Sequence, residues 1–124
     1  MEKIILIDGK EVRFRSTAAV PRLYRIKFGR DIIQDMQSVQ AALKKKEEDG
    51  GNIPPSALEL FENVSYIMAK HADPEGVPSD VDKWFEGFDT FSIYQVLPEI
   101  ISLWEANMRG MVDAKKKSAP RKGK

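Results

Sequence analysis

The chain has 124 residues, of which 20 are basic and 19 are acidic, with one histidine and no cysteine. A chain of this length folds as one domain with a genuine hydrophobic core, so we expect no second domain. The lack of cysteine excludes disulfides, thiolate nucleophiles and sulfur-ligated zinc, and a single histidine excludes a histidine-rich metal site.

The charges are unevenly distributed along the chain. Residues 115–124 carry six basic side chains and no acidic one, whereas residues 1–114 carry 14 basic and 19 acidic residues, a net charge of −5. The last ten residues contain no apolar side chain larger than alanine and cannot offset the cost of ordering by burial. We therefore expect one domain over residues 1–114, followed by a disordered basic tail over residues 115–124.

Residues 1–15 have the pattern of a β-hairpin. Two short apolar-rich runs flank Asp8-Gly9, a pair that accepts the positive φ angles of a type I′ turn. This turn places Ile7 opposite Lys10, and the resulting register puts one set of apolar side chains on a single face: Ile5, Ile7, Val12 and Phe14. The apolar run near the N-terminus spans only four residues, too short for a signal peptide or a membrane span.

From about Thr17 onward the apolar period changes from two to about 3.6, which predicts helices. The first runs to about Phe28, and the second from Arg30 to Gly50-Gly51. A third helix is expected over residues 56–71, and a short fourth helix from residue 79. The last helix is expected to begin at residue 92 and to continue to the end of its apolar stripe. We expect a mainly α fold with a short N-terminal β-hairpin (α+β), in which four to five helices pack as a small domain and occupy more than half of the chain.

Several local features predict how these helices begin and bend. Ser56 and Glu59 have capping-box spacing at the start of the third helix, and Ser79 is suited to cap the short one. Pro98 lies inside the last apolar stripe, where it removes one backbone hydrogen bond and crowds the carbonyl of Tyr94. We therefore expect a kink or a restart of the helix at Pro98.

Six of the eleven aromatic residues fall within 21 positions. Such helical aromatic stripes usually belong to the core, although one or two rings could serve as exposed binding anchors. This set is a candidate client-binding or core aromatic cluster: Trp84, Phe85, Phe88, Phe91, Tyr94 and Trp104.

The residues assemble no catalytic centre. His71 ends a helical stripe and is interpreted as a helix-end or surface histidine. The acidic residues between Asp80 and Asp89 surround a helix and lack the calcium-loop pattern, and the glycines form no phosphate-binding motif. We expect neither enzymatic activity, a cofactor nor a metal.

Two blocks of the sequence resemble tail assembly chaperones of long-tailed phages and prophages of Gram-positive bacteria. The first runs from Val12 to Asp31 and reads VRFRSTAAVPRLYRIKFGRD. The second follows a set order near the end of the chain: Trp84-Phe85, Phe88, Phe91-Ser92-Ile93-Tyr94, Leu97-Pro98-Glu99-Ile100-Ile101 and Leu103-Trp104, before a lysine-rich tail. The resemblance covers nearly the whole chain, and its specificity comes from the order of these blocks.

This resemblance implies a small helical protein of the bacterial cytoplasm that binds the tape-measure protein before the tail tube polymerises. Such chaperones keep an apolar, helical client soluble, help recruit the tail-tube protein, and are absent from the mature virion. The four helical stripes and the unpaired hairpin edge lead us to expect self-association as well, because many weak contacts along a client add up to avidity. No membrane partner is expected.

The family often has a second, longer product made by a ribosomal frameshift near the end of the short reading frame. Lys115, Lys116 and Lys117 are the preferred candidate frameshift region, since an A-rich slippery heptamer can encode them, and Gly123-Lys124 is the alternative site. The alternative function is a small nucleic-acid-binding regulator that uses the basic tail. The acidic charge of residues 1–114 opposes it, because such a binder usually has a basic face, so a nucleic-acid partner is not expected.

Overall fold

The N-terminal hairpin pairs strand β1 (Glu2–Ile7) with strand β2 (Lys10–Arg15) in an antiparallel ladder. We describe it from a computed structural model that gives the backbone of residues 1–118 and the side chains of residues 1–109. Asp8 and Gly9 form the turn with φ angles of 57° and 73°, as a type I′ turn requires. Ile7 lies opposite Lys10, which confirms the predicted register.

This register separates two faces of the hairpin. Ile5, Ile7 and Phe14 are buried against the helices, and Val12 is partly buried beside them. On the other face Ile4 and Leu6 are 56% and 60% exposed. The alternation predicted from the sequence is therefore confirmed, because side chains on a strand point alternately to opposite faces.

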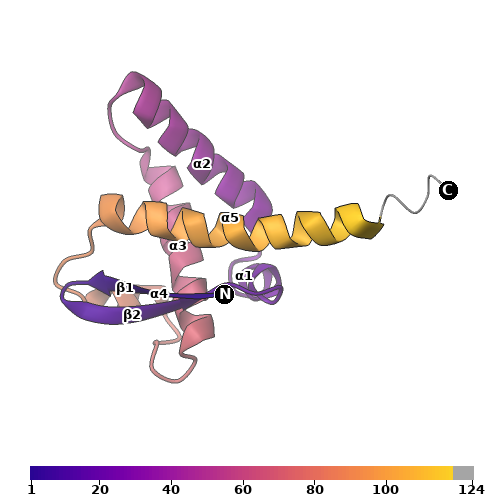
Figure 1. Ribbon diagram of the computed structural model, residues 1–124. Coiled ribbons are helices and arrows are strands. Elements are labelled where there is room, and N and C mark those ends of the chain that lie inside the picture. The colour runs from indigo at the N-terminus through magenta and orange to yellow at the C-terminus, as the bar shows by residue number, and fades with distance from the viewer. Residues whose placement is uncertain (119–124) are drawn as a thin grey trace.

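Helices α1 (Val20–Phe28) and α2 (Ile32–Asp49) are joined by a short turn at Gly29. The φ angle of Gly29 is 67°, a left-handed conformation that ends α1 and that glycine adopts without a steric penalty. The side chain of Asp31 then caps α2 by accepting a hydrogen bond from the Ile33 N–H at 2.9 Å. The chain therefore turns between α1 and α2 within residues 29–31, and Figure 1 shows α1 nearly end-on while α2 runs across the view.

Helix α3 (Pro55–Ala72) is the centre of the fold and packs against β2, α1, α2 and α4. The predicted capping box of Ser56 and Glu59 is wrong, because the helix begins at Pro55 with Pro54 at the N-cap and no side-chain cap. Proline suits the first helical turn, where its missing N–H has no intrahelical partner. The residues that α3 buries are Ala57, Phe61, Val64, Ser65, Tyr66, Ile67, Met68 and Ala69.

A short helix α4 (Val81–Glu86) and a long helix α5 (Ile93–Ser118) complete the five helices of residues 1–118. Asp80, rather than the predicted Ser79, caps α4 by accepting from the Asp82 N–H at 2.8 Å. In Figure 1, α5 crosses in front of α3, with α2 above it and the hairpin below. Lys3 of β1 forms an ion pair with Glu99 of α5. Helices occupy 62% of the chain, which confirms the expected α+β fold.

Helix α5 contains Pro98 and continues on both sides of it, so the restart expected at this residue does not occur. The helix also passes the expected domain boundary at residue 114, since its backbone is helical as far as Ser118. The rest of the predicted tail, residues 119–124, lies outside the described residues.

Replacing Pro98 with alanine is expected to raise the free energy of unfolding by about 2 kcal/mol. Alanine restores an N–H that can bond to the Tyr94 carbonyl, and proline inside a helix costs about 3 kcal/mol, offset in part by its restriction of the unfolded chain. Pro98 is exposed, so little packing is lost. Urea denaturation checks this, with Ser102→Ala, at an exposed position of the same helix, as the control for helix propensity. An unchanged or lower stability of Pro98→Ala would contradict it.

Candidate binding surfaces

Trp84 of α4 is the hub of an aromatic cluster. Its ring is 5% exposed and makes edge-to-face contacts with Phe85, Phe88 and Phe91 at centroid distances of 4.9, 5.5 and 5.8 Å. Such geometry places the positive edge of one ring against the negative face of the next. These four rings are thus the part of the predicted cluster that the fold brings together.

Two further rings complete this cluster from other elements. Phe14 of β2 lies 6.4 Å from Trp84, and Tyr66 of α3 lies 5.8 Å from it, measured between ring centroids. The Tyr66 hydroxyl donates a hydrogen bond to the carbonyl of Pro78. The hairpin register did indicate that Phe14 faces the core, but no signal in the sequence indicates which helix it meets.

Tyr94 and Trp104 lie apart from this cluster. Trp104 is 4% exposed and belongs to the core. Among the described residues, no ring–ring contact involves Trp104. Tyr94 is 53% exposed, and the Lys46 ammonium lies 5.2 Å from its ring centroid. Of the six predicted rings, Tyr94 is therefore the one available as a surface anchor.

An apolar groove lies between α1 and the C-terminal half of α3, with a volume of about 500 Å³. Leu23, Ile26 and Ile67 line its apolar part, and Ile26 is 67% exposed. Lys27 and Lys70 stand at its rim. An exposed isoleucine beside an open apolar groove is the kind of surface that binds an apolar side chain of a partner. We call this surface the α1–α3 groove.

His71 is at the edge of the α1–α3 groove, in the last turn of α3. Its Nε2 lies 2.8 Å from the Thr17 hydroxyl oxygen. Burial lowers the pKa of His71, and the nearby charges of Arg15 and the N-terminal amine lower it further. His71 therefore lies at a helix end, as the sequence predicts, and the structure adds the hydrogen bond with Thr17.

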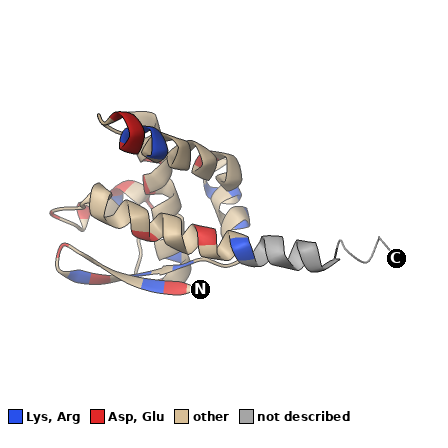
Figure 2. Ribbon diagram, turned by 45° about the horizontal axis from the view of Figure 1, so that its top comes forward, with Lys and Arg blue, Asp and Glu red and all other residues tan. Residues whose placement is uncertain are grey.

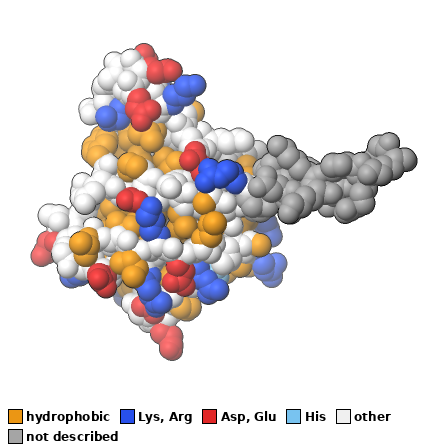
Figure 3. Space-filling view, viewed as in Figure 1, with side chains coloured by type: hydrophobic (Ala, Val, Ile, Leu, Met, Phe, Trp, Pro, Cys, Tyr) orange, Lys and Arg blue, Asp and Glu red, His pale blue; other side chains and the backbone are white. Residues whose placement is uncertain are grey.

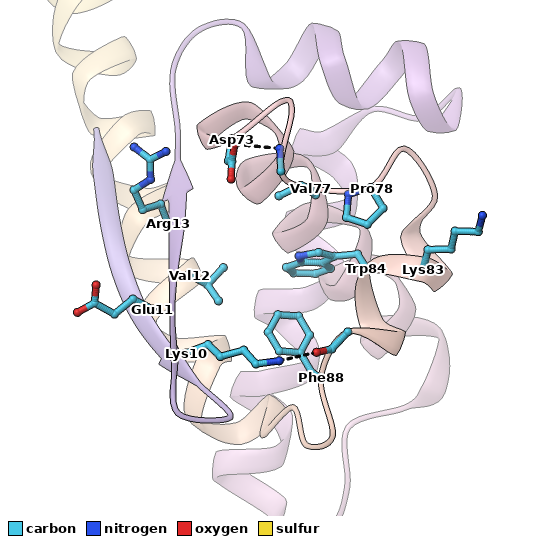
Figure 4. Close-up of a pocket in the computed structure, with 12 residues that line it drawn as sticks. Lys10, Glu11, Val12, Arg13, Asp73, Val77, Pro78, Lys83, Trp84 and Phe88 are labelled. Carbon is cyan, nitrogen blue, oxygen red and sulfur yellow. Dashed lines mark hydrogen bonds between the residues drawn. The ribbon is translucent and has the colours of Figure 1, made fainter.

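A second pocket, of about 380 Å³, separates β2 from α4 and the loop that precedes it (Figure 4). Val12, Trp84 and Phe88 form its apolar part. Lys10 closes one end by donating to the Gly87 carbonyl at 2.8 Å, and Arg13 reaches the Ala72 carbonyl at 3.3 Å. We call this pocket the β2-edge cleft.

A third hollow, of about 450 Å³, collects acidic side chains from α3 and the start of α4. Burial raises the pKa of Glu62, and the neighbouring Glu59 raises it further. The Lys27 ammonium at its rim donates to the Ser79 carbonyl at 2.6 Å. Among the described residues no group of histidine and acidic side chains is arranged to hold a metal ion.

Charged residues of both signs are interspersed along the ribbon in Figure 2. The candidate frameshift residues Lys115, Lys116 and Lys117 belong to α5 by their backbone, but their side chains lie outside the described residues.

Known protein families, curated proteins and solved structures were compared with the chain, and none matches it. Within the described part of the chain, no helix is both long enough and apolar enough to span a lipid bilayer. The role of the chain must therefore be inferred from its own residues and surfaces.

Proposed function

We propose that this protein is a phage tail assembly chaperone, which binds and solubilises the tape-measure protein without catalysing a reaction. The blocks Val12–Asp31 and Trp84–Trp104 support this proposal by their resemblance to that family. In this role it acts in the cytoplasm of the bacterial host, helps recruit the tail-tube protein, and is absent from the mature virion.

The observation that carries the proposal is the α1–α3 groove with its exposed Ile26. An apolar, helical client presents side chains at i, i+3, i+4 and i+7, and a groove of this kind accepts one or two of them. Each such contact is weak, so a long client is held by many copies of the chaperone acting together. This favours self-association along the client.

Other exposed apolar side chains provide surface for those copies to meet. Ile4 and Leu6 are exposed on the outer face of the hairpin, and Tyr94 is exposed at the start of α5. Figure 3 shows hydrophobic side chains over the hairpin and between α2 and α5. The apolar surface is thus spread over several elements, as a protein that coats a client requires.

Coexpression with the tape-measure protein tests the proposal. We expect the two chains to copurify, and Ile26→Ser to reduce the amount of client recovered about tenfold, because a buried isoleucine contact contributes about 1.5–3 kcal/mol. Arg22→Ser is the matched control, since Arg22 is an exposed residue of α1 that does not line the groove. Thermal melts establish that both variants are folded.

Two results would contradict this function. One is a wild-type chain that forms no soluble complex with the tape-measure protein. The other is binding to duplex DNA that falls steeply with salt, which is the signature of the nucleic-acid alternative. The longer product is tested separately. The nucleotide sequence must contain a slippery heptamer near Lys115–Lys117 or near Gly123-Lys124, and an overlapping downstream frame.

A further inference from the structure

The outer edge of β2 has backbone groups with no partner among the described residues. Ser16 N–H donates to the Met1 carbonyl at 2.8 Å and the Met1 amine donates to the Ser16 carbonyl at 3.0 Å, so these residues form a hydrogen-bonded pair. Hydrogen-bonded and non-hydrogen-bonded pairs alternate along an antiparallel ladder. Glu11 and Arg13 consequently turn their N–H and C=O groups away from β1.

These groups face the β2-edge cleft. Figure 4 shows Val12 directed toward Trp84 from the strand, while Glu11 points away on the other side. The opposite wall comes from Val77 and Pro78, which belong to a loop and not to a third strand. The edge of β1 differs, because α5 packs against that strand. Only the β2 edge therefore combines free backbone groups with an apolar pocket in the described part of the chain.

An extended peptide is the ligand that matches this edge. The N–H and C=O groups of alternate strand residues are complemented by those of another strand, which adds at about 4.8 Å from the first. Its side chains then alternate between the two faces, so every second one lies over the apolar part of the cleft. A small apolar side chain at that position would contact Val12 and Phe88.

The charges at the cleft select an acidic segment. Lys10 and Arg13 close the two ends through neutral carbonyl acceptors, and a carboxylate is the stronger acceptor for both cations. Lys83 also lines the cleft, but Figure 4 shows its side chain directed away from β2, so Lys10 and Arg13 are the two cations that count. Of the two acids there, Glu11 points away from the cleft, and Asp73 already accepts a hydrogen bond from the Gly76 N–H at 3.0 Å.

A second copy of β2 suits the edge poorly. The strand contains Lys10, Arg13 and Arg15 against a single acid, Glu11. A second copy therefore brings only one acid to the cations of the edge, and a register centred on Arg13 also places Arg13 opposite Arg13, whereas an acidic segment can place a carboxylate beside each cation. Cationic edges are also a known device against self-pairing of strands, and they leave an acidic strand free to bind.

We propose that the β2-edge cleft binds an extended, acidic segment of a partner protein as a third strand of the hairpin sheet, with an apolar side chain placed over Val12, Trp84 and Phe88. This binding mode goes beyond the proposed chaperone function, because it takes an extended segment at a surface separate from the α1–α3 groove. Its test does not involve the tape-measure protein, so either proposal can fail without the other.

The test uses a fluorescein-labelled peptide of seven residues that alternates glutamate and valine, with binding measured by fluorescence anisotropy on the full chain. We expect the peptide to bind and Arg13→Gln to weaken binding about tenfold through loss of a charged contact. Arg22→Gln, at an exposed position of α1 outside the cleft, is expected to bind as the wild type does.

Backbone pairing is tested by a second peptide with the same sequence, in which alternate amides are N-methylated. We expect it to lose binding, and we expect the unmodified peptide to slow hydrogen exchange at the amides of Glu11 and Arg13. Failure of the unmodified peptide to bind would overturn the proposal. Equal binding of the two peptides would also overturn the proposal. So would protection of the Glu11 and Arg13 amides in the absence of peptide, caused by dimerisation of the protein.

Discussion

Trp84→Ala is expected to lower the free energy of unfolding by about 3–5 kcal/mol, the usual cost of removing a large buried aromatic side chain. Trp84 is 5% exposed and contacts rings from the hairpin, from α3 and from the loop before α5. Its loss leaves a cavity where these elements meet. Because small domains are stable by only about 5–15 kcal/mol, this variant should be partly unfolded at 37 °C.

Chemical denaturation followed by circular dichroism checks the effect, with two variants for comparison. Trp104→Ala should lose a similar amount of stability, because Trp104 is 4% exposed. Tyr94→Ala should lose less than about 1 kcal/mol, because its ring is 53% exposed. A stable Trp84→Ala variant that no longer binds a client would instead make this ring an interface anchor.

Periodicity in the sequence predicts the hairpin and the helices well. The hairpin register follows from Asp8-Gly9, because a two-residue turn fixes which residues lie opposite one another. The breaks at Gly29 and Gly50 follow from the residues that end helices. Both kinds of signal are local, which is why they can be read without knowing the tertiary structure.

The sequence predicts the N-caps of the helices less well. At the start of α4, Ser79 and Asp80 are adjacent and both suit an N-cap, so the sequence alone does not select between them. At the start of α3, the structure uses Pro54-Pro55 in place of the capping box that begins at Ser56. Pro55 fixes the φ angle of the first turn and removes one of the N–H groups that lack an intrahelical partner.

The binding surfaces are the hardest part to predict from the sequence. A helical stripe shows that Ile26 and Tyr94 have apolar character, but not whether another element covers them. The β2-edge cleft joins Lys10–Arg13 to residues 73–88, which are distant in the sequence. Such surfaces depend on tertiary packing, so the sequence places the six aromatic rings in one cluster while the fold separates two of them.

The other large effect expected is at Asp35, a buried charge between α1 and α2. Asp35 is 3% exposed, and its carboxylate accepts hydrogen bonds from the Tyr24 hydroxyl at 2.7 Å and from two nitrogens of Arg30 at 2.7 and 2.8 Å. The hydrogen bonds from Arg30 keep the pKa of Asp35 below its ordinary value, although burial opposes them. Burial and the bond to Asp35 raise the pKa of Tyr24.

Asp35→Ala is expected to lower the free energy of unfolding by about 3 kcal/mol at pH 7, because it leaves the fully buried Tyr24 hydroxyl without an acceptor. Asp35→Asn keeps the size of the side chain and one acceptor oxygen, so it should lower the free energy of unfolding by about half as much. Tyr24→Phe combined with Asp35→Ala should cost less than the sum of the single changes, since it removes both partners. Additive losses in this cycle would contradict a coupled pair.

The pH dependence of stability gives Asp35 a separate test. A carboxyl group whose pKa is lower in the folded state stabilises the protein above its ordinary pKa of 3.8, and this contribution is lost as the pH falls through the folded value. The difference in unfolding free energy between wild type and Asp35→Ala should thus be constant from pH 7 to about 5 and should shrink below about pH 4. Urea denaturation across this range measures it. A difference that stays constant down to pH 2 would mean that the ionised form of Asp35 contributes nothing, and that the loss at pH 7 comes from packing alone.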